Sequence, residues 1–367
     1  MEADAGLLAL DSVFELMQID REWSTRSSRT FTWWAGELAQ VVTAREVERS
    51  FDHDVSRVDI RTDLSQSRNS TEKTAELAVI LNANSMSTSC VVQNEDDPSL
   101  MQLAASLTVH NGVLPWRKQL IAFVAATQAC EAHSLAGGLE GQIGLPAARS
   151  SHPVSGPRTT PDDMLNTISM LVLPKGARPN LFVGEQMKAT LGYAVVPPCV
   201  LVNGDETGIA AEYPFGEATT LVQLTTSGGE PHPLGNGLRV VSRYPVGPSQ
   251  GVSPLSCMDI QLRELHRGAD GLLCLGAWTQ DADGYLYHSL FVPNAIRSSV
   301  EIADFFLAEI HRARWVTEEV YNLPWEVYFR RAFARKAEAI EAFEEHVNGG
   351  GAIPSPYLTP PGPPRSE

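Results

Sequence analysis

The sequence predicts an α+β protein that contains two similar units in tandem, each with an antiparallel sheet and a long helix. Three observations favour this class. Short stretches alternate apolar and polar residues as half-buried strands do, and longer stretches place apolar residues at helical spacing. A short segment also recurs, because residues 106–111 and 289–294 are identical at four of six positions and lie 183 residues apart.

The first unit is expected to begin with a helix over residues 7–23, followed by an aromatic, β-prone stretch over 31–44. Residues 55–64 alternate apolar side chains such as Val58 and Ile60 with charged ones such as Arg57 and Asp59, which predicts a strand with one buried face. The next expected elements are a helix over 71–84, strands over 87–93 and 100–110, and a break at Asn111-Gly112.

A long helix is predicted to start at Pro115, because proline is favoured at the first helical position. Trp116, Leu120 and Phe123 fall on one side of it. Glycines at 137, 138 and 144 are expected to end this helix.

The second unit repeats the element types. Strands are expected over 218–226 and 238–246, and Ser253 with Pro254 forms an N-cap signal before a helix that reaches Arg267. Two further strands over 272–279 and 285–292 surround a turn at Asp283-Gly284. The capping pattern of Ser298 and Glu301 then starts a second long helix.

The predicted organisation has five parts. They are a first α+β unit with its N-terminal helix (1–146), a Pro/Gly-rich connecting region (147–216), a second α+β unit (217–322), an amphipathic C-terminal helix (323–348) and a Pro-rich tail (349–367). The tail is expected to be flexible because its composition cannot form a packed core. Within the connecting region, Pro161, Asp162 and Asp163 predict the start of a short helix.

Charge limits the possible partners. With 28 Lys and Arg against 44 Asp and Glu, the formal net charge is −16, which should repel phosphate backbones and argues against nucleic acid as a partner. The only local basic cluster, at residues 330–336, is expected to be the solvated side of a helix. The first residues are acidic and the longest uncharged run, 77–94, is rich in Asn and Ser, so we expect no export signal and no membrane insertion.

The five cysteines are widely spaced and form no Cys-x-x-Cys pair. They are expected to be small buried hydrophobic residues in a reducing compartment, which predicts a cytoplasmic protein.

The candidate catalytic motifs are weak. Residues 247–251 match the Gly-x-Ser-x-Gly pattern around Ser249, but the helix signal comes later, at Ser253, so a loop is expected. Adjacent Asp162 and Asp163 suit helix capping better than acid/base chemistry.

Metal and cofactor motifs are weak as well. Cys130 and His133 have a spacing that could share a metal, but no second ligand pair lies nearby in the sequence. No phosphate-binding loop or dinucleotide fingerprint occurs. We therefore predict no catalytic, metal-binding or cofactor-binding residue and no cofactor.

The second unit nevertheless resembles a known superfamily through residues 275–278 (Leu-Gly-Ala-Trp), residues 291–294 (Phe-Val-Pro-Asn) and the long helix to Tyr321. It is similar to the type III secretion chaperone-like superfamily, which includes the YbjN-like proteins. The first unit looks like a more divergent copy, and together the two copies cover residues 31–145 and 217–322. The large middle insertion departs from that pattern, so no individual site residue is transferred.

This resemblance implies small acidic units that pair, often as dimers, and hold an extended or amphipathic segment of a client protein. A fused duplication would make the pair intramolecular; a homodimer is the other arrangement. The preferred hypothesis is thus a non-catalytic chaperone-like or adaptor protein, with an apolar groove between its units as the partner site. The alternatives are an enzyme of unrecognised type, with a site near His152, Arg158 and His232, or a structural component of a larger assembly.

Overall fold

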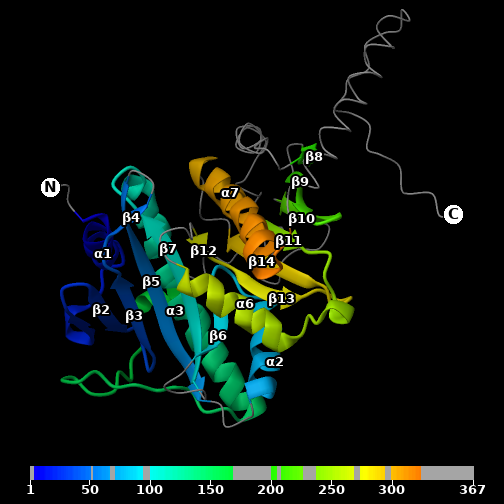
Figure 1. Cartoon of the computed structure of the whole chain (residues 1–367). Coiled ribbons are helices and arrows are strands. Elements are labelled where there is room, and N and C mark those ends of the chain that lie inside the picture. The colour runs from blue at the N-terminus through cyan, green and yellow to red at the C-terminus, as the bar shows by residue number, and fades with distance from the viewer. Residues whose placement is uncertain are drawn as a thin grey trace, which may run out of the picture.

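A computed structural model describes residues 4–50, 53–66, 71–93, 100–167, 200–204, 208–225, 237–267, 273–293 and 299–323. It has a mixed α+β fold with two antiparallel sheets (Figure 1). The strands of the first sheet are β1 (Ser24–Arg26), β2 (Thr30–Trp34), β3 (Ala39–Ala44), β4 (Glu48–Ser50), β5 (His53–Gln66), β6 (Ser89–Gln93), β7 (Leu100–Val109) and β12 (Leu273–Cys274). Those of the second sheet are β8 (Val200–Gly204), β9 (Gly208–Phe215), β10 (Ala218–Thr225), β11 (Gly237–Arg243), β13 (Ala277–Gln280) and β14 (Leu286–Pro293).

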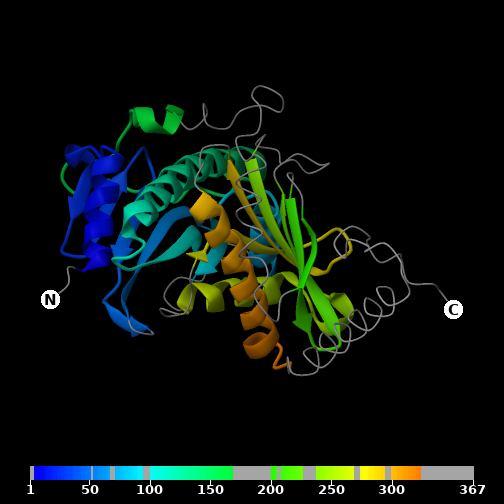
Figure 2. The ribbon, with the colours of Figure 1, turned by 90° about the horizontal axis from the view of Figure 1, so that it is seen from above.

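Helices connect and cover these sheets. The α-helices of the described chain are α1 (Ala5–Leu16), α2 (Thr71–Asn82), α3 (Leu114–Ile143), α4 (Asp163–Thr167), α6 (Pro254–His266) and α7 (Ser299–Trp315). Shorter turns are η1 (Arg21–Trp23), η3 (Pro248–Gln250) and the π-helical η4 (Val316–Val320). Figure 2 shows α1 beside α3 over the first sheet and α7 lying along the second.

The two sheets follow the same path. The first has the order β1-β2-β3-β5-β7-β12, with β6 also paired to β7, and the second has the order β8-β9-β10-β11-β14-β13. In the first sheet the chain runs from β5 through α2 to β6, then to β7, which lies between β5 and β6, and then into the long helix α3. In the second it runs from β11 through α6 and β12 to β13, then to β14, which lies between β11 and β13, and then into the long helix α7. Both long helices then cover one face of their own sheet.

The core of the first unit forms because β5 and β7 alternate. Val58 and Ile60 on β5 and Leu107 and Val109 on β7 are fully buried and share one cluster with residues of α1 and α3. Pro115 occupies the first turn of α3 as expected, and the helix continues through Gly137 and Gly138 to a left-handed C-cap at Gly144, where φ is 73°.

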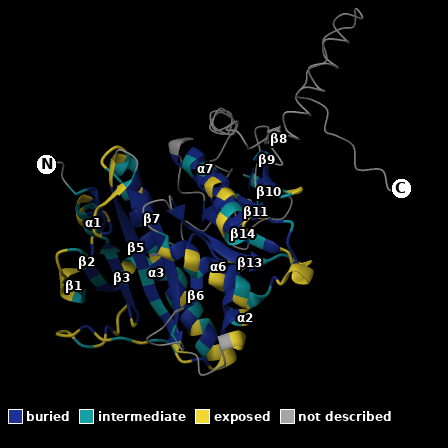
Figure 3. Ribbon diagram, in the orientation of Figure 1, coloured by how far each residue is buried: buried dark blue, intermediate teal, exposed yellow. Residues whose placement is uncertain are grey.

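The second core packs α7 on β9, β10 and β11. Ile302, Phe305 and Phe306 of α7 are fully buried with Leu238 and Val240 of β11. Figure 3 shows that β5, β7, β11 and β14 consist mainly of buried residues, whereas the helices carry exposed residues on their outer sides. Each helix is therefore amphipathic and each sheet is the buried layer.

Several sequence-based boundaries differ from the structure. The N-terminal helix ends at Leu16, because Gln18 takes a positive φ of 50° and the chain then turns toward η1. The stretch 31–44 holds two strands, β2 and β3, paired as a hairpin. Strands β8 and β9 lie within the range 147–216, which was expected only to connect the units. β9 pairs with β10 and β8 pairs with β9, so the second sheet extends into that range.

Other expectations agree with the structure. Ser253 caps α6 by accepting a hydrogen bond from the Ser256 amide, and Pro254 follows it. The turn at Asp283-Gly284 joins the strands as predicted, with φ of 80° at Gly284. Residues 324–367 lie outside the described residues, so the C-terminal helix (323–348) and the tail (349–367) stay predictions.

Backbone hydrogen bonds also join the two units. β12 follows α6 of the second unit, yet it pairs with β7 of the first, with Leu273 opposite Leu107 and Cys274 opposite Ser106. In the opposite direction, the carbonyl oxygens of Met86 and Ser87, just before β6, accept hydrogen bonds from the amides of Phe291 (3.0 Å) and Gly276 (3.1 Å). Backbone hydrogen bonds thus join the units at two places: β12 enters the first sheet, whereas the second sheet, which consists of β8–β11, β13 and β14, receives only these two hydrogen bonds.

Gly276, whose amide donates to Ser87 of the first unit, has a φ of +80°. A Cβ there would collide with the carbonyl oxygen of Ser289. We expect Gly276→Ala to lower the free energy of unfolding by more than about 2 kcal/mol, since it adds a backbone clash to the cost of a left-handed alanine. Chemical denaturation measures this directly.

Gly251→Ala is the matched control, because Gly251 has a similar φ of +86° but no atom within 4 Å of its Cβ position. It should cost only about 1 kcal/mol. Equal losses for the two variants would contradict the proposed packing at Gly276.

Candidate functional site

The candidate site is a hollow where α6 of the second unit crosses the first sheet. It is lined by Arg61 of β5, Val91 of β6, Gln102 and Ala104 of β7, and Leu262, Leu265 and His266 of α6. The hollow is small, with a cavity volume of about 10 Å³, which is room for about one water molecule. Both units therefore contribute to its wall.

Alternation along β5 explains which face of the sheet meets α6. Since Val58 and Ile60 point toward α3, their neighbours Arg57, Asp59 and Arg61 point to the opposite face. Arg57 is 2% exposed there and its Nη2 donates to the carbonyl oxygen of Leu265 at 2.9 Å. The C-terminal end of α6 is thereby fixed to the first sheet by a charged side chain.

Arg57 belongs to a buried polar chain beside the hollow. Its Nη2 donates to Ser106 Oγ at 2.7 Å, and Ser106 in turn donates to Asp59 Oδ1 at 2.5 Å. The other carboxylate oxygen of Asp59 accepts from Arg45 Nε at 2.5 Å. Because these groups satisfy one another, this side of the hollow is rigid.

Gln102 also lines the hollow, but its side chain is only partly hydrogen-bonded. Its side-chain Nε2 donates to Asp63 Oδ1 at 2.5 Å, which orients the amide. The amide oxygen Oε1 is buried and has no hydrogen-bond partner. A buried acceptor without a donor costs about 1–3 kcal/mol.

The wall opposite Arg61 is apolar. Val91, Ala104 and Leu265 are buried, Leu262 is half-buried, and His266 at the end of α6 is exposed. The hollow thus combines an apolar surface, a guanidinium group and one unpaired acceptor. Its volume suits one water molecule and is too small for a side chain.

Glu131 of α3 holds the segment before β6 that bonds to the second unit. Its carboxylate accepts from the Met86 amide at 3.2 Å and from Thr88 Oγ1 at 3.0 Å. Burial raises the pKa of Glu131 to about 7, although these two hydrogen bonds act in the opposite direction. The segment that pairs with Phe291 and Gly276 is therefore held to α3 as well.

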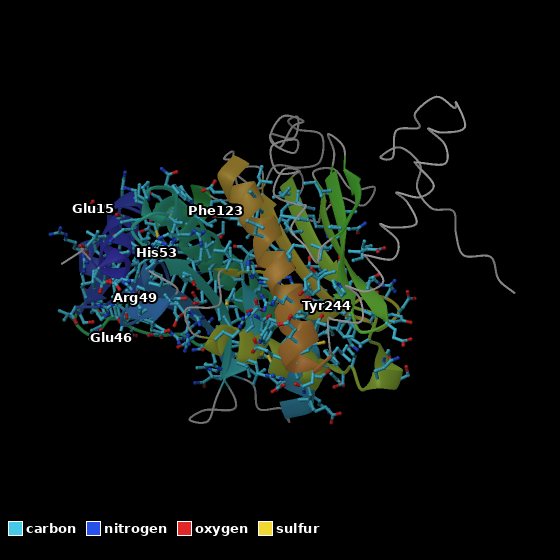
Figure 4. All side chains as sticks on the ribbon, turned by 45° about the horizontal axis from the view of Figure 1, so that its top comes forward. Glu15, Glu46, Arg49, His53, Phe123 and Tyr244 are labelled. Carbon is cyan, nitrogen blue, oxygen red and sulfur yellow. The ribbon has the colours of Figure 1, made fainter. Side chains whose placement is uncertain are left out.

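A second buried polar network lies in the second unit. Arg312 of α7 donates to Glu264 of α6 at 2.8 Å and also bonds Glu309, while Trp278 Nε1 donates to Glu264 Oε2 at 2.7 Å. His288 Nδ1 lies 2.9 Å from Glu309 Oε1. Tyr244, labelled in Figure 4, packs against Trp278 with ring centroids 5.3 Å apart.

This network joins α6, α7 and β14 inside the core. Burial alone would raise the pKa of Glu309, but the charges of Arg312 and His288 outweigh it and hold that pKa at about 2. The carboxylate therefore stabilises the fold above its unfolded pKa near 4.5, and this contribution is lost as the pH falls toward 2. All these groups are buried, which indicates a structural role.

The middle region places its candidate residues in structural roles too. His152 Nδ1 accepts from the amides of Val154 (3.3 Å) and Ser155 (2.9 Å), as in a turn. Arg158 donates to the carbonyl oxygen of Trp34 at 2.8 Å and to Asp162 at 3.2 Å. His232 lies outside the described residues, so the structure does not bring these three residues together.

The remaining motifs are also explained locally. Ser249 lies in η3, where its Oγ donates to Gln250 at 2.9 Å, and the next α-helix starts only at Pro254. Asp162 Oδ1 accepts from the Met164 amide at 3.0 Å, as a cap of α4 does. Of the cysteines, Cys90, Cys257 and Cys274 are buried and free, and Cys130 is half-buried and free.

Cys130 and His133 do not converge. The Cys130 thiol lies 3.6 Å from the carbonyl oxygen of Leu165, whereas His133 Nδ1 lies 2.8 Å from that of Ala129. Across the described ranges, no group of three or more His, Cys, Asp or Glu side chains could hold a metal ion. In the same part of the chain, no helix is both long enough and apolar enough to cross a membrane.

Comparison of the chain with protein-family models, with curated proteins and with solved structures finds no match.

The hollow, which depends on Gln102, Ala104 and Leu262, could not be predicted from the sequence. These residues were assigned to a strand and a helix, but nothing local shows that those two elements meet. The one available signal was the alternation on β5, which placed charged residues on a face that some other element could cover.

Arg312 offers a direct test of the second network. Its side chain is 3% exposed, so Arg312→Met should leave two buried carboxylates without their cation. We expect the free energy of unfolding to fall by about 3–5 kcal/mol. Arg314→Met on the same helix is the control, since its pair with Glu318 is exposed and should contribute less than about 1 kcal/mol. Similar losses in both variants would contradict the buried network.

Proposed function

We propose that the chain is a tandem duplication of one chaperone-like α+β unit, and that it is a non-catalytic cytoplasmic protein that holds an extended client segment at the junction of its units. The junction beside α6 is the observation that carries the binding proposal, because Leu262 of the second unit lies partly exposed against the first sheet there.

The shared path of the two sheets supports duplication. Ser106 on β7 and Ser289 on β14, which begin the recurring segment, occupy the same place in their sheets, between the fourth strand and a strand on the other side. The fourth strands also correspond, since Arg57-Val58 on β5 and Arg239-Val240 on β11 lie at the same distance in register from these serines. Because the two sheets share both a strand order and a sequence segment, a common origin is favoured.

The reciprocal crossing supports an intramolecular pair. Two units that exchange backbone with each other, and whose helices α2 and α6 pack together, have the arrangement of a two-fold dimer. The resemblance to type III secretion chaperone-like and YbjN-like proteins implies such pairing and client binding. The acidic chain, with a net charge of −16, favours a protein partner over nucleic acid.

Client binding can be tested by affinity capture with the full chain. Leu262→Glu places a charge in the hollow and should abolish recovery of the client polypeptides that the wild-type chain retains, because the apolar surface is lost. Mass spectrometry of the retained polypeptides gives the result.

Leu255→Glu is the matched control. Leu255 lies on the same helix and is 43% exposed, but it does not line the hollow, so this variant should retain the same polypeptides as the wild type. The proposal would be refuted if the wild type retained no polypeptide, or if both variants retained the wild-type set.

A further inference from the structure

We propose that residues 324–348 pack as an amphipathic helix on the outer sides of α2 and of the N-terminal half of α6, and so cover exposed apolar residues of both units. Residues 324–348 lie outside the described residues, and their helix is predicted from the sequence. The inference concerns a contact within one chain, so it is independent of client binding.

The predicted helix has one strongly apolar side. Apolar residues recur three or four positions apart, which places them on a single face: Phe329, Phe333, Ala337, Ile340, Phe343 and Val347. Three phenylalanine rings on one face of a helix favour an apolar partner, because burying them removes a large apolar area from water.

The described chain ends beside α6. Arg263 Nη2 of α6 donates to the carbonyl oxygen of Glu319 at 3.3 Å. Two residues further on, burial and the neighbouring Cys257 of α6 raise the pKa of Tyr321. Between residues 319 and 321 the chain thus moves toward the N-terminal end of α6, and residues 324–348 start from that end.

Helix α2 lies next to the same end of α6. Both helices approach Thr279 of β13, whose Oγ1 donates to the carbonyl oxygen of Val79 at 3.1 Å and whose carbonyl oxygen accepts from Cys257 Sγ at 3.6 Å. The two helices pack side by side, and their outer sides face the viewer in Figure 1. One surface is therefore built from a helix of each unit.

This surface carries exposed apolar residues from both helices. Ile80 of α2 is 65% exposed and Leu255 of α6 is 43% exposed. Leu77 and Leu81, which are close to Ile80 on α2, are half-buried. Exposed apolar residues that adjoin half-buried ones are typical of a surface that another element covers. An amphipathic helix covers such a surface through side chains spaced like those of residues 329–347.

Charge favours the same surface. On α2, α6 and η4 the exposed acidic residues outnumber the exposed basic ones, namely Glu72, Glu76, Asp259 and Glu319 against Lys73 and Arg263. Residues 330–336 contain four Arg and Lys residues, so this half of the segment is attracted to the acidic surface. Lys336 lies seven positions after Phe329 and hence on the same side, from which its ammonium group can reach the carboxylates.

The segment is long enough to reach both helices. From residue 329 to 347 the predicted helix extends about 27 Å, whereas α6 with its 13 residues is about 20 Å long. Residues 324–328 precede the apolar face and can bridge up to about 17 Å. The segment can therefore cross α6 at Leu255 and continue to Ile80.

Hydrogen exchange of the full-length chain, read by mass spectrometry, tests this contact. In the wild type the amides of residues 329–347 should be protected. Ile80→Glu should speed their exchange by at least about 10-fold, because it replaces an apolar contact by a charge. Phe333→Glu changes the segment itself and should have the same effect.

Leu16→Glu is the matched control. Leu16 is 51% exposed, but it ends α1, which lies away from α2 and α6 (Figure 1), so exchange of residues 329–347 should stay at the wild-type rate.

Carbodiimide cross-linking locates the contact in the wild-type chain. Lys336 should couple to Glu72, Glu76 or Asp259, and mass spectrometry identifies the joined peptides. A mixture of isotopically labelled and unlabelled chains distinguishes coupling within one chain from coupling between two copies.

The outcomes are distinct from those of client capture. Unprotected amides over 329–347 in the wild type, or equal exchange in the wild type and both segment-contact variants, would overturn the proposal. Coupling of Lys336 only to carboxylates elsewhere in the chain, or only between copies, would overturn it as well. None of these results changes the polypeptides that Leu262→Glu is expected to lose.

Discussion

The backbone hydrogen bonds that join the two units are the constraint on which the rest of the structure depends. β12 pairs with β7, and the residues before β6 pair with Phe291 and Gly276. Unpaired buried backbone groups cost free energy. If the units moved apart, these amides and carbonyls would lose their hydrogen-bond partners. The relative position of α6 and the first sheet, and hence the hollow, follows from this exchange.

Each sheet has two different faces, one covered by a long helix of its own unit and one that faces the other unit. The faces covered by α3 and α7 belong to one apolar cluster that includes residues of both units, and buried charges such as the Arg312 network are satisfied internally. The opposite faces carry polar and charged residues and meet helices from the other unit. The client binding proposed at Leu262 would therefore involve both units at once.

Much of the local structure could be predicted from the sequence. The alternation of Val58 and Ile60 with charged residues predicted β5, and Pro115 and Ser253 marked the starts of two helices, because these signals act within a few residues. Strands β8 and β9 were missed in a range rich in proline and glycine. The pairing of β12 with β7 joins residues far apart in sequence, and periodicity does not report such contacts. The candidate site depends on that pairing, so it could not be predicted either.

Native-state hydrogen exchange at the junction tests this account most directly. The amides of Phe291 and Gly276, which donate to the first unit, should exchange only through global unfolding, with the same protection and denaturant dependence as core amides of β5 and β7. Exchange of these two amides at a much lower free energy than the strand cores would show that the units separate independently, and would contradict the account.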